Sequence, residues 1–114
     1  MSFLNVSFRG AKELTDKIEI LDAKTYAKAI SDTKVQLVDV RSPAEYNSGH
    51  IKNAVNIDFF DSVNFERSFD KMSKERPVYL YCRSGSRSRR ASHKLARMGF
   101  VKIYDLKGGY LRWK

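Results

Sequence analysis

Short apolar runs alternate along the chain with longer segments in which apolar residues recur at helical spacing. The run 35–40 is nearly all apolar, which is typical of a parallel strand covered on both faces. The run 78–81 follows Pro77 and combines β-branched, aromatic and aliphatic residues, so it also predicts a buried strand. Three further strands are expected at 18–21, 54–57 and 101–104.

Helices are predicted between these strands. Ser42, Pro43 and Glu45 supply the N-cap, the first-turn proline and the capping-box carboxylate of one helix. A longer helix begins at Ser86, carries one apolar stripe and is closed by Gly99. The remaining helical segments are expected after the N-cap Asp22, at 63–72 and, as a final turn, at 110–114.

This alternation implies crossover connections and a three-layer α/β fold, with a central, mainly parallel sheet of about five strands and helices on both faces. A chain of 114 residues holds one domain, which we place at 18–114. Residues 1–17 have weak periodicity and are interpreted as an N-terminal extension or a short helix packed on the domain. Functional sites in such sheets lie at the carboxyl ends of strands, where Cys82 falls.

Basic residues outnumber acidic ones, 22 to 13, and give a formal net charge of +9. We interpret Arg83 and Arg87 as residues that attract small anions or acidic partners, because they flank the predicted turn after Cys82. Three further basic residues of the following helix, Arg90, Lys94 and Arg97, lie opposite its apolar stripe and are expected to form a solvated face. Nucleic-acid binding is not expected, because this basic cluster lacks interleaved aromatic residues and a binding motif.

No segment is apolar for long enough to span a membrane, and charged residues interrupt 1–17, so that segment is no secretory signal. The protein is therefore expected to be cytoplasmic and to bind no membrane. A periplasmic location stays open, since removal of an export signal would leave the same sequence.

The only cysteine, Cys82, lies at the turn from the strand 78–81 to the helix that begins at Ser86. A helix N-terminus presents unpaired N–H groups that stabilise an anion, and Arg83 and Arg87 add positive charge. These surroundings favour the thiolate, which is the nucleophilic form of cysteine. The alternative is a buried, unreactive cysteine that acts as a small hydrophobic residue.

Three motifs in order resemble the rhodanese-domain sulfurtransferases. The segment Cys82-Arg83-Ser84-Gly85-Ser86-Arg87-Ser88 is similar to the active-site loop of that family. The segments 37–46 and 49–57 resemble its N-terminal signature, and the segments 99–100 and 104–110 with Trp113 resemble its C-terminal one. The resemblance runs from about Ile18 to the end of the chain.

The resemblance implies a rhodanese-like fold and transfer of sulfane sulfur through a persulfide on Cys82. Its donor would be a small anion such as thiosulfate, and its acceptor cyanide or a thiol. Because the chain has no second cysteine, the acceptor must be external, either a low-molecular-weight thiol or a thioredoxin-like protein. No cofactor and no metal are implied. The residues expected to bind the sulfur and its donor are Arg83, Ser84, Gly85, Ser86, Arg87 and Ser88.

Several of these residues also have structural interpretations. Arg87 could tie the loop to a carboxylate, the three serines could be turn or cap residues, and Gly85 could serve the backbone geometry. Asp39, Arg41 and Glu45 are expected to form an ion-pair and capping framework rather than an acid–base set. His50 and His93 are expected to be non-catalytic.

Two other functions stay open. Related folds use a cysteine loop to hold an oxyanion, as in phosphatases and arsenate reductases, but place the arginine one residue later than Arg87. The shorter loop here fits a sulfur atom better than a phosphate. The second alternative is a sulfur-carrier or binding module with little independent turnover.

Overall fold

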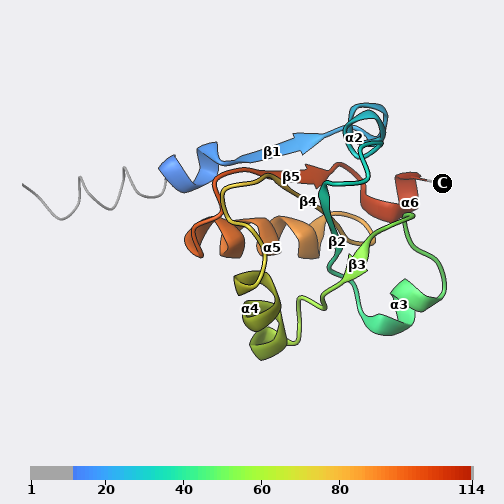
Figure 1. Ribbon diagram of the computed structural model, residues 1–114. Helices are drawn as coiled ribbons and strands as arrows, with labels where there is room; N and C mark the ends of the chain where they lie inside the picture. The colour runs from blue at the N-terminus through green and yellow to red at the C-terminus, as the bar shows by residue number, and fades with distance from the viewer. Residues whose placement is uncertain (1–11, 114) are drawn as a thin grey trace, which may run out of the picture.

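The computed structural model describes residues 12–113, which form a single twisted sheet covered by helices (Figure 1). The sheet has five strands in the order β1-β5-β4-β2-β3, and every pair of neighbours is parallel. This confirms the predicted α/β architecture. The strands are β1 (Ile18–Leu21), β2 (Gln36–Asp39), β3 (Val55–Asn56), β4 (Val78–Tyr81) and β5 (Ile103–Leu106).

Two of the helices that connect the strands begin at the predicted caps. Asp22 accepts a hydrogen bond from the Thr25 amide, and Ser42 and Glu45 form the full capping box. The helices are α2 (Ala23–Ala29), α3 (Pro43–Asn47), α4 (Ser62–Asp70), α5 (Ser86–Arg97) and α6 (Gly109–Trp113).

Residues 12–16 are also helical, and Leu14 packs against the core. The part of the proposed N-terminal extension at 1–11 lies outside the described residues. The domain boundary at residue 18 therefore stays a prediction.

Two predicted elements are displaced. The last strand starts at Ile103 rather than Val101, because the Val101 amide donates to the Lys74 carbonyl and its half-exposed side chain lies outside the sheet. The predicted helix 63–72 runs from Ser62 to Asp70, because Asp61 caps its first turn.

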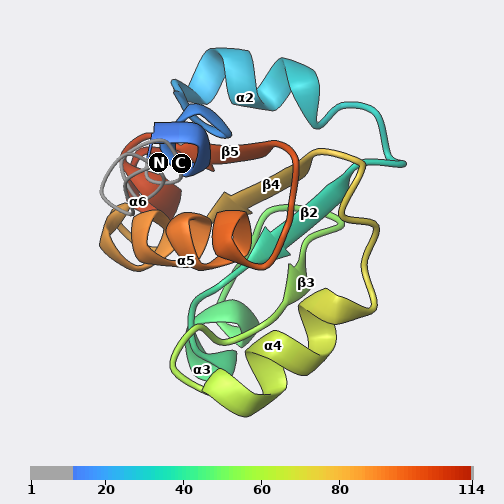
Figure 2. The ribbon, with the colours of Figure 1, turned by 90° about the vertical axis from the view of Figure 1, so that its left-hand side faces the viewer.

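Alternating side chains of β4 build two hydrophobic cores, one on each face of the sheet. Val78 and Leu80 pack with α4 and α5 on one face, whereas Tyr79 and Tyr81 pack on the other face with α2 and α6. Figure 2 shows α2 across the sheet from α5. Since β4 lies in the middle of the sheet, its carboxyl end is held on both sides, and Cys82 follows it directly.

Candidate active site

Cys82 begins a short loop that turns the chain from β4 into α5. Its sulfur accepts a hydrogen bond from the Gly85 amide at 3.1 Å and lies 3.4 Å from the Ser88 hydroxyl oxygen. Gly85 makes the turn with φ of 117°, a conformation in which other residues are strained. Helix α5 starts after Gly85 without a side-chain cap, so its first-turn amides are left facing the loop.

The cysteine is more deeply buried than its place at the mouth of the sheet suggests. Cys82 is only 1% exposed and belongs to the core on the α5 face. The residue thus combines the burial of an inert cysteine with the main-chain contact expected of a nucleophile. Arg83, Ser84 and Ser86, which follow it in the loop, are exposed.

The outer side of the loop is held by helix α6. The Tyr110 amide donates to the Cys82 carbonyl at 2.8 Å, and the Leu111 amide donates to the Arg83 carbonyl at 3.0 Å. Gly109 allows this approach, because a Cβ there would lie 2.5 Å from the Arg83 carbonyl oxygen. This contact was not predicted from the sequence.

Arg87 forms a two-point ion pair with Glu45. Its Nη1 and Nη2 lie 2.6 and 2.9 Å from the two carboxylate oxygens. The Arg87 hydrogen bond is the main reason that the pKa of Glu45 falls from 4.5 to about 2. This is the structural interpretation considered for Arg87, a loop tied to a carboxylate. A contact between Arg87 and a donor stays a prediction, as it does for the other loop residues.

Asp39 and Arg41 form the buried framework that the sequence predicted. Arg41 donates to both carboxylate oxygens of Asp39 through Nε, and through Nη2 at 2.6 Å. Nη2 also donates to the Gly49 carbonyl, and the guanidinium lies over the Tyr110 ring. Both charged residues are at least 95% buried, so the pair fixes the chain after β2 beneath the site.

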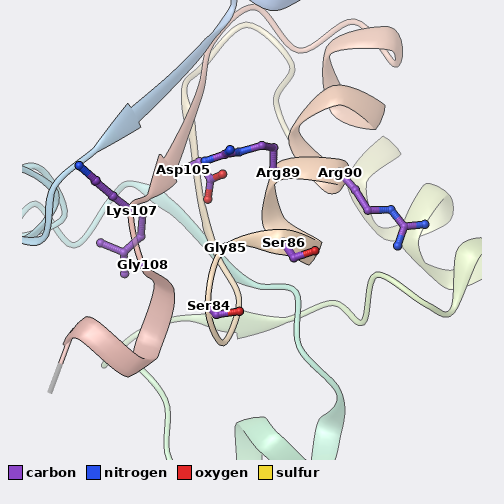
Figure 3. A pocket seen from close by; sticks show the side chains of 9 residues that line it. Ser84, Gly85, Ser86, Arg89, Arg90, Asp105, Lys107 and Gly108 are labelled. Atoms are coloured by element: carbon purple, nitrogen blue, oxygen red, sulfur yellow. The ribbon is translucent and has the colours of Figure 1, made fainter.

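A cavity of about 420 Å³ lies between the loop, the first turn of α5 and the end of β5 (Figure 3). Its walls carry Arg89, Arg90 and Lys107, and Asp105 reaches it from β5. Asp105 is only 1% exposed, and its Oδ1 has no hydrogen-bond partner within the described chain.

The pKa of Asp105 is shifted by its surroundings. Burial raises it from 3.8 to about 6, against the opposite effects of the Ser88 side chain and Arg89. No role for Asp105 was predicted from the sequence. The available signal was a carboxylate within an otherwise apolar strand.

The contacts of the two histidines are not those of a Cys-His catalytic pair. His50 is exposed and stacks on Tyr46, with ring centroids 3.7 Å apart, and its Nδ1 lies 2.9 Å from the Tyr46 carbonyl oxygen. His93 lies on α5 beside Ile18 and Ile20. Within residues 12–113, no three His, Cys, Asp or Glu side chains are grouped to hold a metal ion. The helices described there are too short or too polar to cross a membrane.

The family model of the rhodanese-like domain matches residues 22–114. The chain belongs to this family. It is 32% identical to the thiosulfate sulfurtransferase GlpE of Pseudomonas syringae over 88 residues, which cover 77% of this chain and 80% of that protein.

Other relatives differ in length and name. The chain is 37% identical to a tRNA uridine(34) hydroxylase of Pelagibacter ubique over 93 residues, 82% of this chain but 31% of that protein. It spans less than two thirds of the first curated relatives that it matches. A rhodanese-related crystal structure from Thermoplasma volcanium superposes with a TM-score of 0.71 at 25% identity, over 83% of this chain and 89% of that chain.

Proposed function

We propose that this rhodanese-like domain is a sulfurtransferase that moves sulfane sulfur through a persulfide on Cys82. The Cys82 thiolate attacks the outer sulfur of thiosulfate, and the sulfur–sulfur bond of the donor breaks with its electron pair leaving on sulfite. A thiolate or cyanide acceptor then attacks the outer sulfur of the persulfide, and Cys82 leaves as a thiolate. The acceptor is external, because the chain has no second cysteine.

The observation that carries this proposal is the Gly85 amide on the Cys82 sulfur at the start of α5. A main-chain donor there stabilises negative charge on sulfur without a charged partner in contact. The exposed Arg83 adds positive charge at the rim for an anionic donor. Relatives that include a thiosulfate sulfurtransferase support the same chemistry.

Intact mass after incubation with thiosulfate tests the first step. The wild-type protein should gain one sulfur atom, and Cys82→Ser should gain none. Addition of cyanide should remove the sulfur and yield thiocyanate. No mass gain on well-folded wild-type protein would refute thiosulfate as a donor, and an equal gain on Cys82→Ser would refute the site.

A sulfur-carrier or binding module is the second candidate. It is favoured by the similarity to the tRNA uridine(34) hydroxylase of Pelagibacter ubique, because the matched domain makes up only 31% of that protein. A carrier would form the persulfide and pass it to a protein thiol, such as a thioredoxin-like acceptor, while turning over cyanide slowly. A binding module would form no persulfide. Turnover of an aryl phosphate, offered in place of thiosulfate, tests for phosphatase activity. The short loop disfavours that activity.

A further inference from the structure

Asp105 is a buried carboxylate with an incomplete set of hydrogen bonds. The residue is only 1% exposed, and its Oδ1 has no hydrogen-bond partner in the described part of the chain. Such an atom costs free energy, because it has lost its hydration and gained no donor in return. Asp105 also lines the cavity beside the cysteine loop, and its side chain extends from β5 towards Gly85 (Figure 3). A ligand in this cavity that donates hydrogen bonds would complete the contacts of the carboxylate.

Of the three basic residues in the cavity wall, Arg89 is the one directed at Asp105. The Arg90 guanidinium lies over the Phe59 ring, 5.1 Å from its centroid. The Lys107 ammonium interacts electrostatically with the carboxylate that caps α2. Arg89 is exposed and extends from the first turn of α5 towards Asp105 (Figure 3). No salt bridge within the described part of the chain involves it.

A cation and an anion therefore border one cavity without an ion pair between them. This arrangement is complementary to an α-amino acid group, which carries a carboxylate and an ammonium on the same carbon atom. The Arg89 guanidinium matches the carboxylate, which the nearby N-terminus of α5 also favours, and Asp105 Oδ1 matches the ammonium. A simple anion would leave the Asp105 oxygen without a donor, and a simple cation would be repelled by Arg89. The cavity volume of about 420 Å³ lies within the range of about 300–1,000 Å³ that is usual for small-molecule sites.

Access to the Asp105 carboxylate depends on Arg89. The Oδ1 atom is shielded from solvent, and the arginine side chain extends towards it (Figure 3). Because this side chain is exposed and long, it can turn onto the carboxylate of a ligand and so uncover Oδ1. Arg89 is thus both the cover of the site and its contact for an anionic group.

We propose that this cavity binds the α-amino acid group of a low-molecular-weight thiol, and that this thiol is the acceptor of the sulfur. The acceptor role rests on the proposed function, which requires a thiol from outside the chain. Gly85 connects the cavity with the reacting sulfur, since it lines the cavity and its amide lies 3.1 Å from Cys82 Sγ.

The transfer step is balanced by the two thiols alone. The acceptor thiol loses its proton to the solvent, and its sulfur forms a bond with the outer sulfur of the Cys82 persulfide. The bond between the two persulfide sulfurs breaks, and its electron pair stays on Cys82 Sγ. The acceptor leaves as a persulfide of the amino acid.

NMR titration of the wild-type protein with S-methyl-L-cysteine tests the binding site without sulfur transfer, because the methylated sulfur cannot accept the persulfide sulfur. Amide signals of residues that line the cavity, 84–86 and 105–108, should shift and saturate. S-methyl-β-mercaptopropionate lacks the ammonium, and S-methylcysteamine lacks the carboxylate. Each should bind about tenfold more weakly, the factor that one hydrogen bond between charged groups is worth. Equal binding of the three compounds, or no saturable shift with S-methyl-L-cysteine, would overturn the proposal.

Two variants assign the contacts on the protein. Asp105→Asn and Arg89→Met should each weaken the binding of S-methyl-L-cysteine about tenfold. Arg97→Met, at the exposed far end of α5, is the control for loss of one positive charge and should change the binding less than about twofold. Wild-type affinity in Asp105→Asn or in Arg89→Met would overturn the proposed contacts. The comparison of the three compounds uses the wild-type protein, so it decides the case in which Asp105→Asn fails to fold.

Sulfur transfer from the persulfide of the wild-type protein tests the acceptor role. L-cysteine should show a KM about tenfold lower than that of β-mercaptopropionate, when the two are compared by their thiolate concentrations. Equal KM values would refute the acceptor role. If no persulfide forms at all, the proposed function fails and the acceptor role with it, whereas saturable binding of S-methyl-L-cysteine would still support the amino acid site.

Discussion

Arg87 and Glu45, 42 positions apart in the chain, join the helix of the active-site loop to the capping box of α3 through two hydrogen bonds. One oxygen of the same carboxylate also accepts from the Ser42 amide at 3.0 Å. The carboxylate therefore serves two elements at once. The Arg87–Glu45 pair therefore joins the N-terminal signature to the cysteine loop, although the two motifs are separate in the sequence.

This pair should make stability depend on pH in acid. The pKa of Glu45 is about 2 in the folded protein and 4.5 ordinarily, so its contribution is complete above about pH 4.5 and is lost as the pH falls towards 2. Glu45→Gln should lower the free energy of unfolding at neutral pH by about 1–2 kcal/mol, allowing for solvent screening of a part-exposed pair. Urea unfolding at several pH values measures the difference, which should shrink below pH 4.5. A constant difference would contradict the assignment.

Arg83 and Arg87 should respond differently to mutation. Arg83 is exposed at the rim, so Arg83→Ala should raise the KM for thiosulfate about threefold with little change in stability, and added salt should reduce the difference. Arg87→Ala should reduce stability, because it leaves Glu45 without its partner. Arg97→Ala, at the exposed far end of α5, is the control for loss of one positive charge. Equal effects of Arg83→Ala and Arg97→Ala on KM would count against a role for the rim.

Mutation of the Asp39–Arg41 ion pair should lower the free energy of unfolding more than mutation of an exposed ion pair. Asp39→Asn leaves a buried guanidinium without its counter-charge and should cost about 3–5 kcal/mol of unfolding free energy. Asp70→Asn is the matched control, since Asp70, the last residue of α4, forms an exposed ion pair with Lys74, and its loss should cost less than about 1 kcal/mol. Chemical denaturation measures both. Similar losses of unfolding free energy in the two variants would show that burial gives the Asp39–Arg41 pair no greater effect on stability than an exposed pair has.

Gly109→Ala should impair the loop without altering any residue in it. The new Cβ would lie 2.5–2.6 Å from the Cys82 and Arg83 carbonyls, so α6 and the loop must separate. We expect persulfide formation to slow at least about tenfold, as for a small displacement of reacting groups. Gly99→Ala is the control, because Gly99 also has a positive φ but its nearest contact is a lysine side chain at 3.8 Å. Its persulfide formation should stay at the wild-type rate in protein that is still folded.

Local signals predicted most of the fold. The capping box at Ser42 and Glu45 and the apolar run of β4 are short-range patterns, and both elements form where they were expected. The displaced start of β5 could not be predicted from short-range patterns. It depends on the Lys74 carbonyl, which binds the Val101 amide from a distant segment.

The site was predicted less completely, for the same reason. The loop and the Asp39–Arg41 framework follow from adjacent residues. The roles of Gly109 and Asp105 arise only when β5 and α6 are brought beside the loop by the sheet order. The near-complete burial of Cys82 likewise depends on how α5 packs and has no signature in the loop itself.

The two amides of α6 that bind the loop carbonyls belong to Tyr110 and Leu111. The cysteine is thus tethered by a segment nearly thirty residues downstream that never touches the sulfur. Displacing α6 would loosen the peptide around Cys82 while leaving every loop side chain in place, so the position of α6 controls the reactivity of this thiol from outside the loop.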